Sequence, residues 1–78
     1  MQRTDHEIDA AGLICPEPLM LVRNRVRGMA VGQVLHVVAT DPAADRDFRD
    51  FCRFLGHELV EVRKSGDRLE FWIRKGGT

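Results

Sequence analysis

Residues 34–42 read VLHVVATDP, and this stretch decides the fold. Val34 to Thr40 is rich in β-branched residues and mostly apolar on both faces, which is typical of a central strand. The pair Asp41-Pro42 then offers an N-cap and a proline in the first turn of a helix. We therefore expect a strand inside a sheet that leads directly into a helix.

The segments on either side of this stretch complete a βαβαββ order. We expect a strand at 6–10, a helix at 16–27 before Gly28, the strand at 34–40, a helix at 41–55 before Gly56, and strands at 58–64 and 68–74 around a turn. This order favours an α+β fold, a two-layer α/β sandwich whose four-stranded mixed sheet carries both helices on one face. Trp72 alternates out of phase with Phe71 and Ile73, so it is expected on the bare face.

Size and composition limit what the chain can be. Its 78 residues are expected to form a single domain over 1–78, and 44% hydrophobic with 31% charged residues fits a folded globular domain. With Cys15 and Cys52 as the only cysteines, a disulfide framework and a four-cysteine zinc site are excluded. The three histidines show no ligand spacing, so no metal site is expected.

Charge and hydropathy indicate a cytoplasmic protein. The formal net charge is zero, which argues against strong non-specific binding of nucleic acid. No stretch is apolar for long enough to span a membrane. The polar start, Met1 to Asp9, has neither a signal-peptide nor a transit-peptide pattern. In a reducing compartment a thiol stays free unless it takes part in chemistry.

Residues 13–18, LICPEP, contain the candidate nucleophile, Cys15. A cysteine ahead of a helix lies at the positive end of the helix dipole, which lowers the thiol pKa. Glu17 opposes this effect, so a moderately reactive thiolate is predicted. Pro16 and Pro18 are expected to fix the first helical turn and to hold the thiol in one position. Because position 18 is a proline, the CxxC pair of a dithiol oxidoreductase is absent.

Helical spacing separates core residues from surface residues. In the first helix Met20, Arg23 and Arg27 form a strip that leads away from Cys15, and we interpret it as a docking surface. The predicted core faces contain Leu19, Val22, Val26 and Met29 in the first helix and Ala44, Phe48, Phe51, Cys52 and Leu55 in the second. Cys52 is therefore interpreted as a core residue, whereas Phe54 lies off this face.

The box Cys15-Pro16-Glu17-Pro18 resembles the signature of the TusA family of sulfur carriers, within the wider TusA/SirA/YedF group. Further similar segments are Gly12-Leu13, Met20 and Arg23, Val38 to Ala43, Asp47, Phe51-Cys52, Gly56-His57-Glu58-Leu59 and Ile73 to Gly76. The resemblance covers nearly the whole chain. It implies the βαβαββ sandwich and a cofactor-free sulfurtransferase that acts as a relay.

The resemblance also implies a reaction and its partners. A cysteine desulfurase or a rhodanese would load sulfane sulfur on Cys15 as a persulfide, and a TusD/DsrE-like acceptor protein would receive it. The pathway is tRNA 2-thiouridine synthesis or cytoplasmic sulfur oxidation, and the sequence does not choose between them. The candidate docking residues are Met20, Arg23, Arg27, Asp41 and Phe54.

Two readings from other classes stay open. A small RNA-binding module would use the stripe of Arg46, Arg49 and Arg53, although aspartates flank each of these arginines. A thiol redox sensor would pair Cys15 with Cys52 or with a second chain. Salt-dependent RNA binding would support the first reading, and a peroxide-induced disulfide would support the second. The oligomeric state is not indicated.

Overall fold

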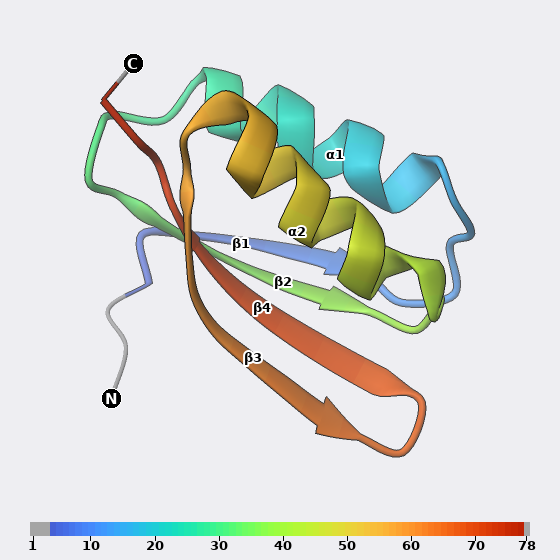
Figure 1. The fold of residues 1–78 in the computed structure, drawn as a ribbon. Coiled ribbons are helices and arrows are strands. Elements are labelled where there is room, and N and C mark those ends of the chain that lie inside the picture. The colour runs from blue at the N-terminus through green and yellow to red at the C-terminus, as the bar shows by residue number, and fades with distance from the viewer. Residues whose placement is uncertain (1–3, 78) are drawn as a thin grey trace.

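The computed structural model describes residues 4–77 of the chain. Its elements, in chain order, are β1 (His6–Ala10), α1 (Glu17–Arg27), β2 (Val34–Ala39), α2 (Ala43–Leu55), β3 (Glu58–Ser65) and β4 (Arg68–Arg74) (Figure 1). The predicted βαβαββ order is therefore confirmed. The domain predicted over 1–78 and the polar segment at 1–9 include positions 1–3 and 78, which lie outside the described residues.

The sheet has the strand order β1-β2-β4-β3. β1 runs parallel to β2, whereas β4 is antiparallel to both of its neighbours, so the sheet is mixed as predicted. Both helices lie over the same face of the sheet (Figure 1). This arrangement is the predicted two-layer α+β sandwich, and it places the apolar strand β2 in the interior of the sheet, where Val37 is aligned with Ile8 and with Phe71.

The core lies between the helices and the covered face of the sheet. Phe48 of α2 is fully buried and packs edge-on against Phe71 of β4, with ring centroids 4.7 Å apart. The other buried members of this cluster are Val22, Val26, Met29, Leu35, Val37, Ala39, Ala44, Phe51, Cys52, Leu69 and Ile73. The alternation predicted for β4 is thus correct.

The helix boundaries differ slightly from the prediction. α1 begins at Glu17 and α2 at Ala43. Pro16 and Pro42 were predicted to lie in the first turn of each helix, but they occupy the N-cap positions just before it. Asp41 is consequently not the N-cap residue. Its carboxylate still accepts a hydrogen bond from the Ala43 N–H at 3.0 Å, because an aspartate side chain can close a turn two residues ahead.

One core prediction was wrong. Leu55 was placed on the buried face of the second helix, but its side chain is 49% exposed. It is the last helical residue before Gly56, where the backbone turns at a φ of 75°. Because the helix ends here, no further turn packs over this side chain, and it contributes instead to the surface between the two helices.

The other face of the sheet carries no helix (Figure 1). Trp72 points to this face as predicted and is half-buried there. Its ring stacks on His36 at 4.7 Å, and the Arg63 guanidinium lies 5.3 Å from its centroid. His36 also contacts the Glu70 carboxylate at 2.9 Å. Contacts among aromatic and charged side chains of the strands therefore partly shield this open face of the sheet from solvent.

Candidate functional site

Cys15 lies in the loop between β1 and α1. The strands β1 and β2 are parallel, so their carboxyl ends meet at one edge of the sheet, and the loops that lead to α1 and α2 lie together there (Figure 1). The Gly12 N–H donates to Thr40 Oγ1 at 2.9 Å and joins the two loops. The topology thus brings an exposed thiol beside the start of the second helix.

Asp41 holds the backbone of the Cys15 loop. One carboxylate oxygen accepts a hydrogen bond from the Cys15 N–H at 2.6 Å, while the other accepts from the Ala43 N–H. These two backbone donors, Ala43 first, hold the pKa of the Asp41 carboxyl below its ordinary value. A carboxylate that is ionised and bonded on both oxygens fixes the distance between the loop before α1 and the loop before α2.

Asp47 of α2 is the side chain in contact with the thiol. Its Oδ2 accepts a hydrogen bond from Cys15 Sγ at 2.9 Å. This bond, followed by partial desolvation and the negative charges of Asp47 and Asp41, raises the pKa of the Cys15 thiol above its ordinary value, and Arg46 opposes the rise. The prediction of a lowered pKa was therefore wrong, because it considered the helix dipole without the carboxylates of the second helix.

The prolines and Glu17 form the start of α1. The Pro16 carbonyl accepts a hydrogen bond from the Met20 N–H at 3.0 Å, and the Cys15-Pro16 peptide is cis. Pro18 is buried, whereas Glu17 is exposed. The buried Pro18 packs the first turn of the helix against the protein, which leaves Cys15 in the exposed turn before it.

Cys52 belongs to the core. It is only 4% exposed, on the face of α2 that packs onto the sheet, and burial raises the pKa of its thiol to about 11. Both cysteines are free thiols, one exposed and one buried. A buried thiol with a raised pKa is a poor nucleophile, so the core interpretation of Cys52 is supported.

Three of the five candidate docking residues line the surface between the helices. Arg23 and Phe54 line a hollow together with Asp47, and Arg23 and Arg27 line a neighbouring one together with Lys75. The two hollows share Arg23, Phe51 and Leu55, so we treat them as one α1–α2 groove. Met20 and Asp41 do not line this groove.

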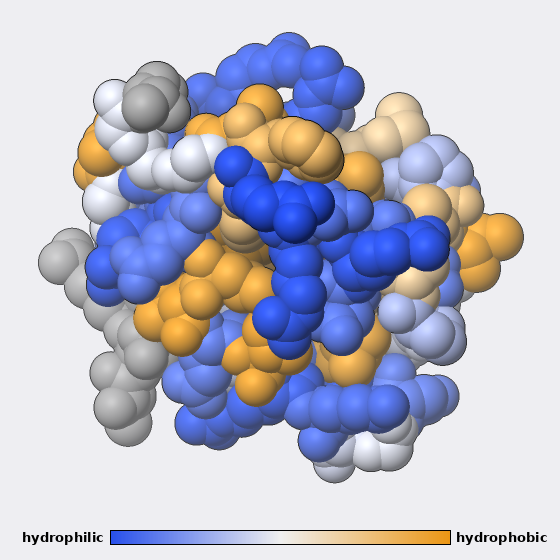
Figure 2. All heavy atoms as spheres, viewed as in Figure 1, coloured by the Kyte–Doolittle hydropathy of each residue, from blue (hydrophilic) through white to orange (hydrophobic). Residues whose placement is uncertain are grey.

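The exposed apolar side chains of this region are large. Phe54 is 76% exposed and Met20 is 55% exposed. On the face of the molecule seen in Figure 2, hydrophobic side chains form separate patches among hydrophilic ones. Phe54 thus gives the groove exposed apolar area, and its charged lining contains both Arg23, Arg27 and Lys75 and the carboxylates of Asp47 and Asp50.

The arginines of the two helices differ in their partners. In α2, Arg49 Nε lies 2.7 Å from Asp45 Oδ1, and Arg53 Nη2 lies 3.1 Å from Asp50 Oδ1. Arg46 Nε is farther from its neighbour, 3.9 Å from Asp47 Oδ1. Arg23 and Arg27 of α1, by contrast, form no ion pair within residues 4–77. The arginines of the α2 stripe thus each have a carboxylate of the same helix within 4 Å, whereas Arg23 and Arg27 have none among the described residues.

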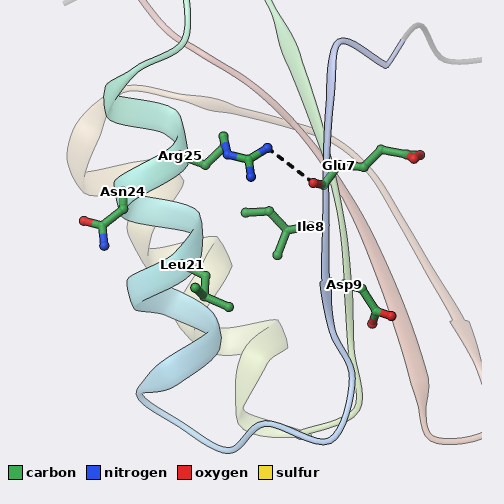
Figure 3. Close-up of a pocket in the computed structure, with 6 residues that line it drawn as sticks. All are labelled: Glu7, Ile8, Asp9, Leu21, Asn24 and Arg25. Carbon is green, nitrogen blue, oxygen red and sulfur yellow. Dashed lines mark hydrogen bonds between the residues drawn. The ribbon is translucent and has the colours of Figure 1, made fainter.

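A further hollow separates α1 from β1 (Figure 3). Arg25 reaches across it and donates a hydrogen bond to the Glu7 carbonyl at 3.4 Å. Leu21, Asn24, Ile8 and Asp9 complete its lining, and none of these side chains is a thiol or a hydroxyl. Among the described residues there is also no cluster of metal-ligating side chains, and no helix in that range is long and apolar enough to cross a membrane.

Known proteins resemble this chain over most of its length. Residues 6–75 match the model of the family described as Sulfurtransferase TusA. The chain is 52% identical over 71 residues to the sulfur carrier protein TusA of Pseudomonas paraeruginosa, covering 91% of this chain and 90% of the relative. It is 48% identical over 71 residues to the protein of the same name from Pseudomonas putida, covering 91% and 89%.

A solved structure resembles the fold. The crystal structure of a SirA-like protein from Desulfitobacterium hafniense superposes with a TM-score of 0.81, covering 92% of this chain and 99% of that one. The sequence identity is 22%, so this similarity concerns the fold alone.

Proposed function

Because this chain belongs to the TusA family of sulfurtransferases, we propose that it carries sulfane sulfur as a persulfide on Cys15. It accepts this sulfur from a cysteine desulfurase or a rhodanese and passes it to a TusD/DsrE-like acceptor protein. The chain acts as a relay, since each partner protein supplies the rest of the reaction site. The observation that carries the proposal is the exposed Cys15 thiol on a loop that Asp41 holds in place.

The transfer needs only one sulfur of the carrier. The Cys15 sulfur attacks the outer sulfur of the donor persulfide, and the donor cysteine leaves as a thiolate. The acceptor thiolate later attacks the outer sulfur on Cys15 in the same way. Neither step requires a metal or an organic cofactor of the carrier. A small domain with one accessible thiol is chemically sufficient for this relay.

The α1–α2 groove supports a docking role for the surface beside the thiol. Arg23 and Arg27 extend along it without an ion-pair partner among the residues described, and Phe54 lines it with apolar area. Met20 is exposed on α1 outside the groove. A partner surface that is acidic around an apolar centre is complementary to this one. Asp41 is proposed to contribute indirectly, through the position of Cys15.

The two alternative readings are less well supported. RNA binding through Arg46, Arg49 and Arg53 would require breaking their contacts with neighbouring aspartates. A disulfide between Cys15 and Cys52 would require Cys52 to leave the core, where it is 4% exposed. We therefore retain the carrier, with tRNA 2-thiouridine synthesis or cytoplasmic sulfur oxidation as the pathway that it serves.

A radiolabel transfer experiment tests the proposal. The protein is incubated with a cysteine desulfurase, pyridoxal phosphate and sulfur-labelled cysteine, and then repurified and mixed with a TusD/DsrE-like acceptor. We expect reductant-sensitive label on the carrier, absent from Cys15→Ser, and its passage to the acceptor. Absence of label with this donor, and also with a rhodanese and labelled thiosulfate, would contradict the proposal.

A further inference from the structure

The thiol of Cys15 is bound to a residue that the carrier reaction does not require. Cys15 Sγ lies 2.9 Å from Asp47 Oδ2, and Asp47 is held on the second turn of α2 with its side chain 17% exposed. A carboxylate can only accept in this bond, so the sulfur must carry the proton. The resting carrier thus presents Cys15 as a hydrogen-bonded thiol.

The charges around this sulfur favour the thiol over the thiolate. Asp47 contacts the sulfur directly, and Asp41 lies beside it in the loop before α2. Arg46 provides the opposing positive charge, but its Nε is 3.9 Å from Asp47 Oδ1. Both the geometry and the balance of charge therefore retain the proton on Cys15.

We propose that Asp47 is a positioning residue that keeps the resting Cys15 protonated and less reactive, and that a partner protein frees the sulfur by engaging the Asp47 carboxylate. This inference rests on the proposed sulfur-carrier function. The group that engages Asp47 is a cationic or hydrogen-bond-donating side chain beside the partner's own sulfur. Such control limits attack by Cys15 on disulfides and electrophiles other than those of its partners.

When the partner engages Asp47, the Sγ proton passes to solvent and leaves a thiolate. Its electron pair forms a bond to the outer sulfur of the donor persulfide, the S–S bond of the donor breaks, and the donor cysteine leaves as a thiolate. One S–S bond forms as another breaks, so Cys15 is oxidised and the donor cysteine is reduced by the same amount.

The pH profile of alkylation tests the proposal without any sulfur donor. Iodoacetamide reacts with the thiolate, so its rate with Cys15 follows the ionised fraction. We expect Asp47→Asn to raise the rate at neutral pH by roughly threefold or more and to move the inflection to lower pH. Asp47→Glu should restore part of the wild-type profile. Asp45→Asn removes a carboxylate of the same helix that pairs with Arg49, and should leave the profile unchanged.

Release by a partner is tested by comparing two rates. In the wild-type protein, a docked desulfurase already releases the Cys15 sulfur from Asp47, whereas iodoacetamide does not. The substitution Asp47→Asn should therefore raise the rate of loading by the desulfurase less than it raises the rate of alkylation. An equal rise in both rates would contradict release by the partner. An unchanged or upward-shifted alkylation profile would overturn the role of Asp47 as a whole. Circular dichroism verifies the fold of each variant, and Asp47→Ser serves as a second uncharged replacement.

The alkylation and loading results also separate this inference from the proposed function. If the wild-type protein is loaded with sulfur but the alkylation profile ignores Asp47, the carrier function stands and this inference fails. If the profile shifts as expected but no donor loads the wild-type protein, the control of the thiol stands and the carrier function fails.

Discussion

Replacing the two cysteines one at a time should separate stability from chemistry. Cys52 is 4% exposed within the apolar core, where a thiol behaves as a small hydrophobic group. Cys52→Ser introduces a hydroxyl there, at a cost of about 1–3 kcal/mol when it is poorly satisfied. A bond from the hydroxyl to the carbonyl one turn earlier in α2 reduces this cost, so we expect about 1–2 kcal/mol.

That loss is large for a domain of this size. In a 60–100-residue domain, 1 kcal/mol lowers Tm by about 4–8 °C, so Cys52→Ser should melt roughly 5–15 °C below the wild type. Cys15 is exposed, and Cys15→Ser should leave the melting temperature nearly unchanged. Cys52→Ala provides the control without a polar group.

The assay combines urea denaturation, followed by circular dichroism, with sulfur loading of each folded variant. Cys52→Ser should lose stability and keep full loading at a temperature where it is folded. Cys15→Ser should keep its stability and lose all loading. Equal loss of loading in the two folded variants would refute the reasoning, because Cys52 would then take part in the transfer. An unchanged stability of Cys52→Ser would show that this position is not apolar core.

Three further predictions address charge and protonation. Burial raises the pKa of the Cys52 thiol from 9.0 to about 11 in the folded protein. The protonated thiol therefore stabilises the folded state fully below pH 9, and this stabilisation is lost as the pH rises toward 11. In urea unfolding, the wild type should lose stability relative to Cys52→Ala across this range. The double variant Arg23→Glu/Arg27→Glu should slow loading by a protein donor about tenfold or more, and leave loading by a small persulfide unchanged. The matched control, Arg49→Glu, should slow neither reaction, and equal effects of the two charge reversals would count against docking along α1. Asp41→Asn replaces two acceptor oxygens by one, so the loading rate should fall about threefold as the Cys15 loop loosens; an unaffected rate would show that the loop does not depend on Asp41.

The fold followed from local patterns because its elements differ clearly in periodicity. Val34 to Ala39 is apolar on both faces, and the sheet surrounds it on both sides as such a strand requires. Phe71 and Ile73 alternate with Trp72, which separates the covered face from the open one. Leu55 was misplaced because helical spacing does not reveal that the helix ends there and that no element covers it.

The site was predictable only in part. Cys15 was identifiable because its Cys-Pro-x-Pro context is local in sequence. Its hydrogen bonds to Asp41 and Asp47 connect residues 26 and 32 positions apart, and they arise from the parallel pairing of β1 with β2. No periodicity within a single helix reports such a contact, so the direction of the Cys15 pKa shift was predicted wrongly.

The most direct test of the carrier function is intact-mass spectrometry of the protein after incubation with a cysteine desulfurase, pyridoxal phosphate and cysteine. We expect a mass gain of one sulfur atom that a reductant reverses and that Cys15→Ser does not acquire. The same gain in Cys15→Ser, or no gain with this donor or with a rhodanese and thiosulfate, would contradict the assignment of the persulfide to Cys15.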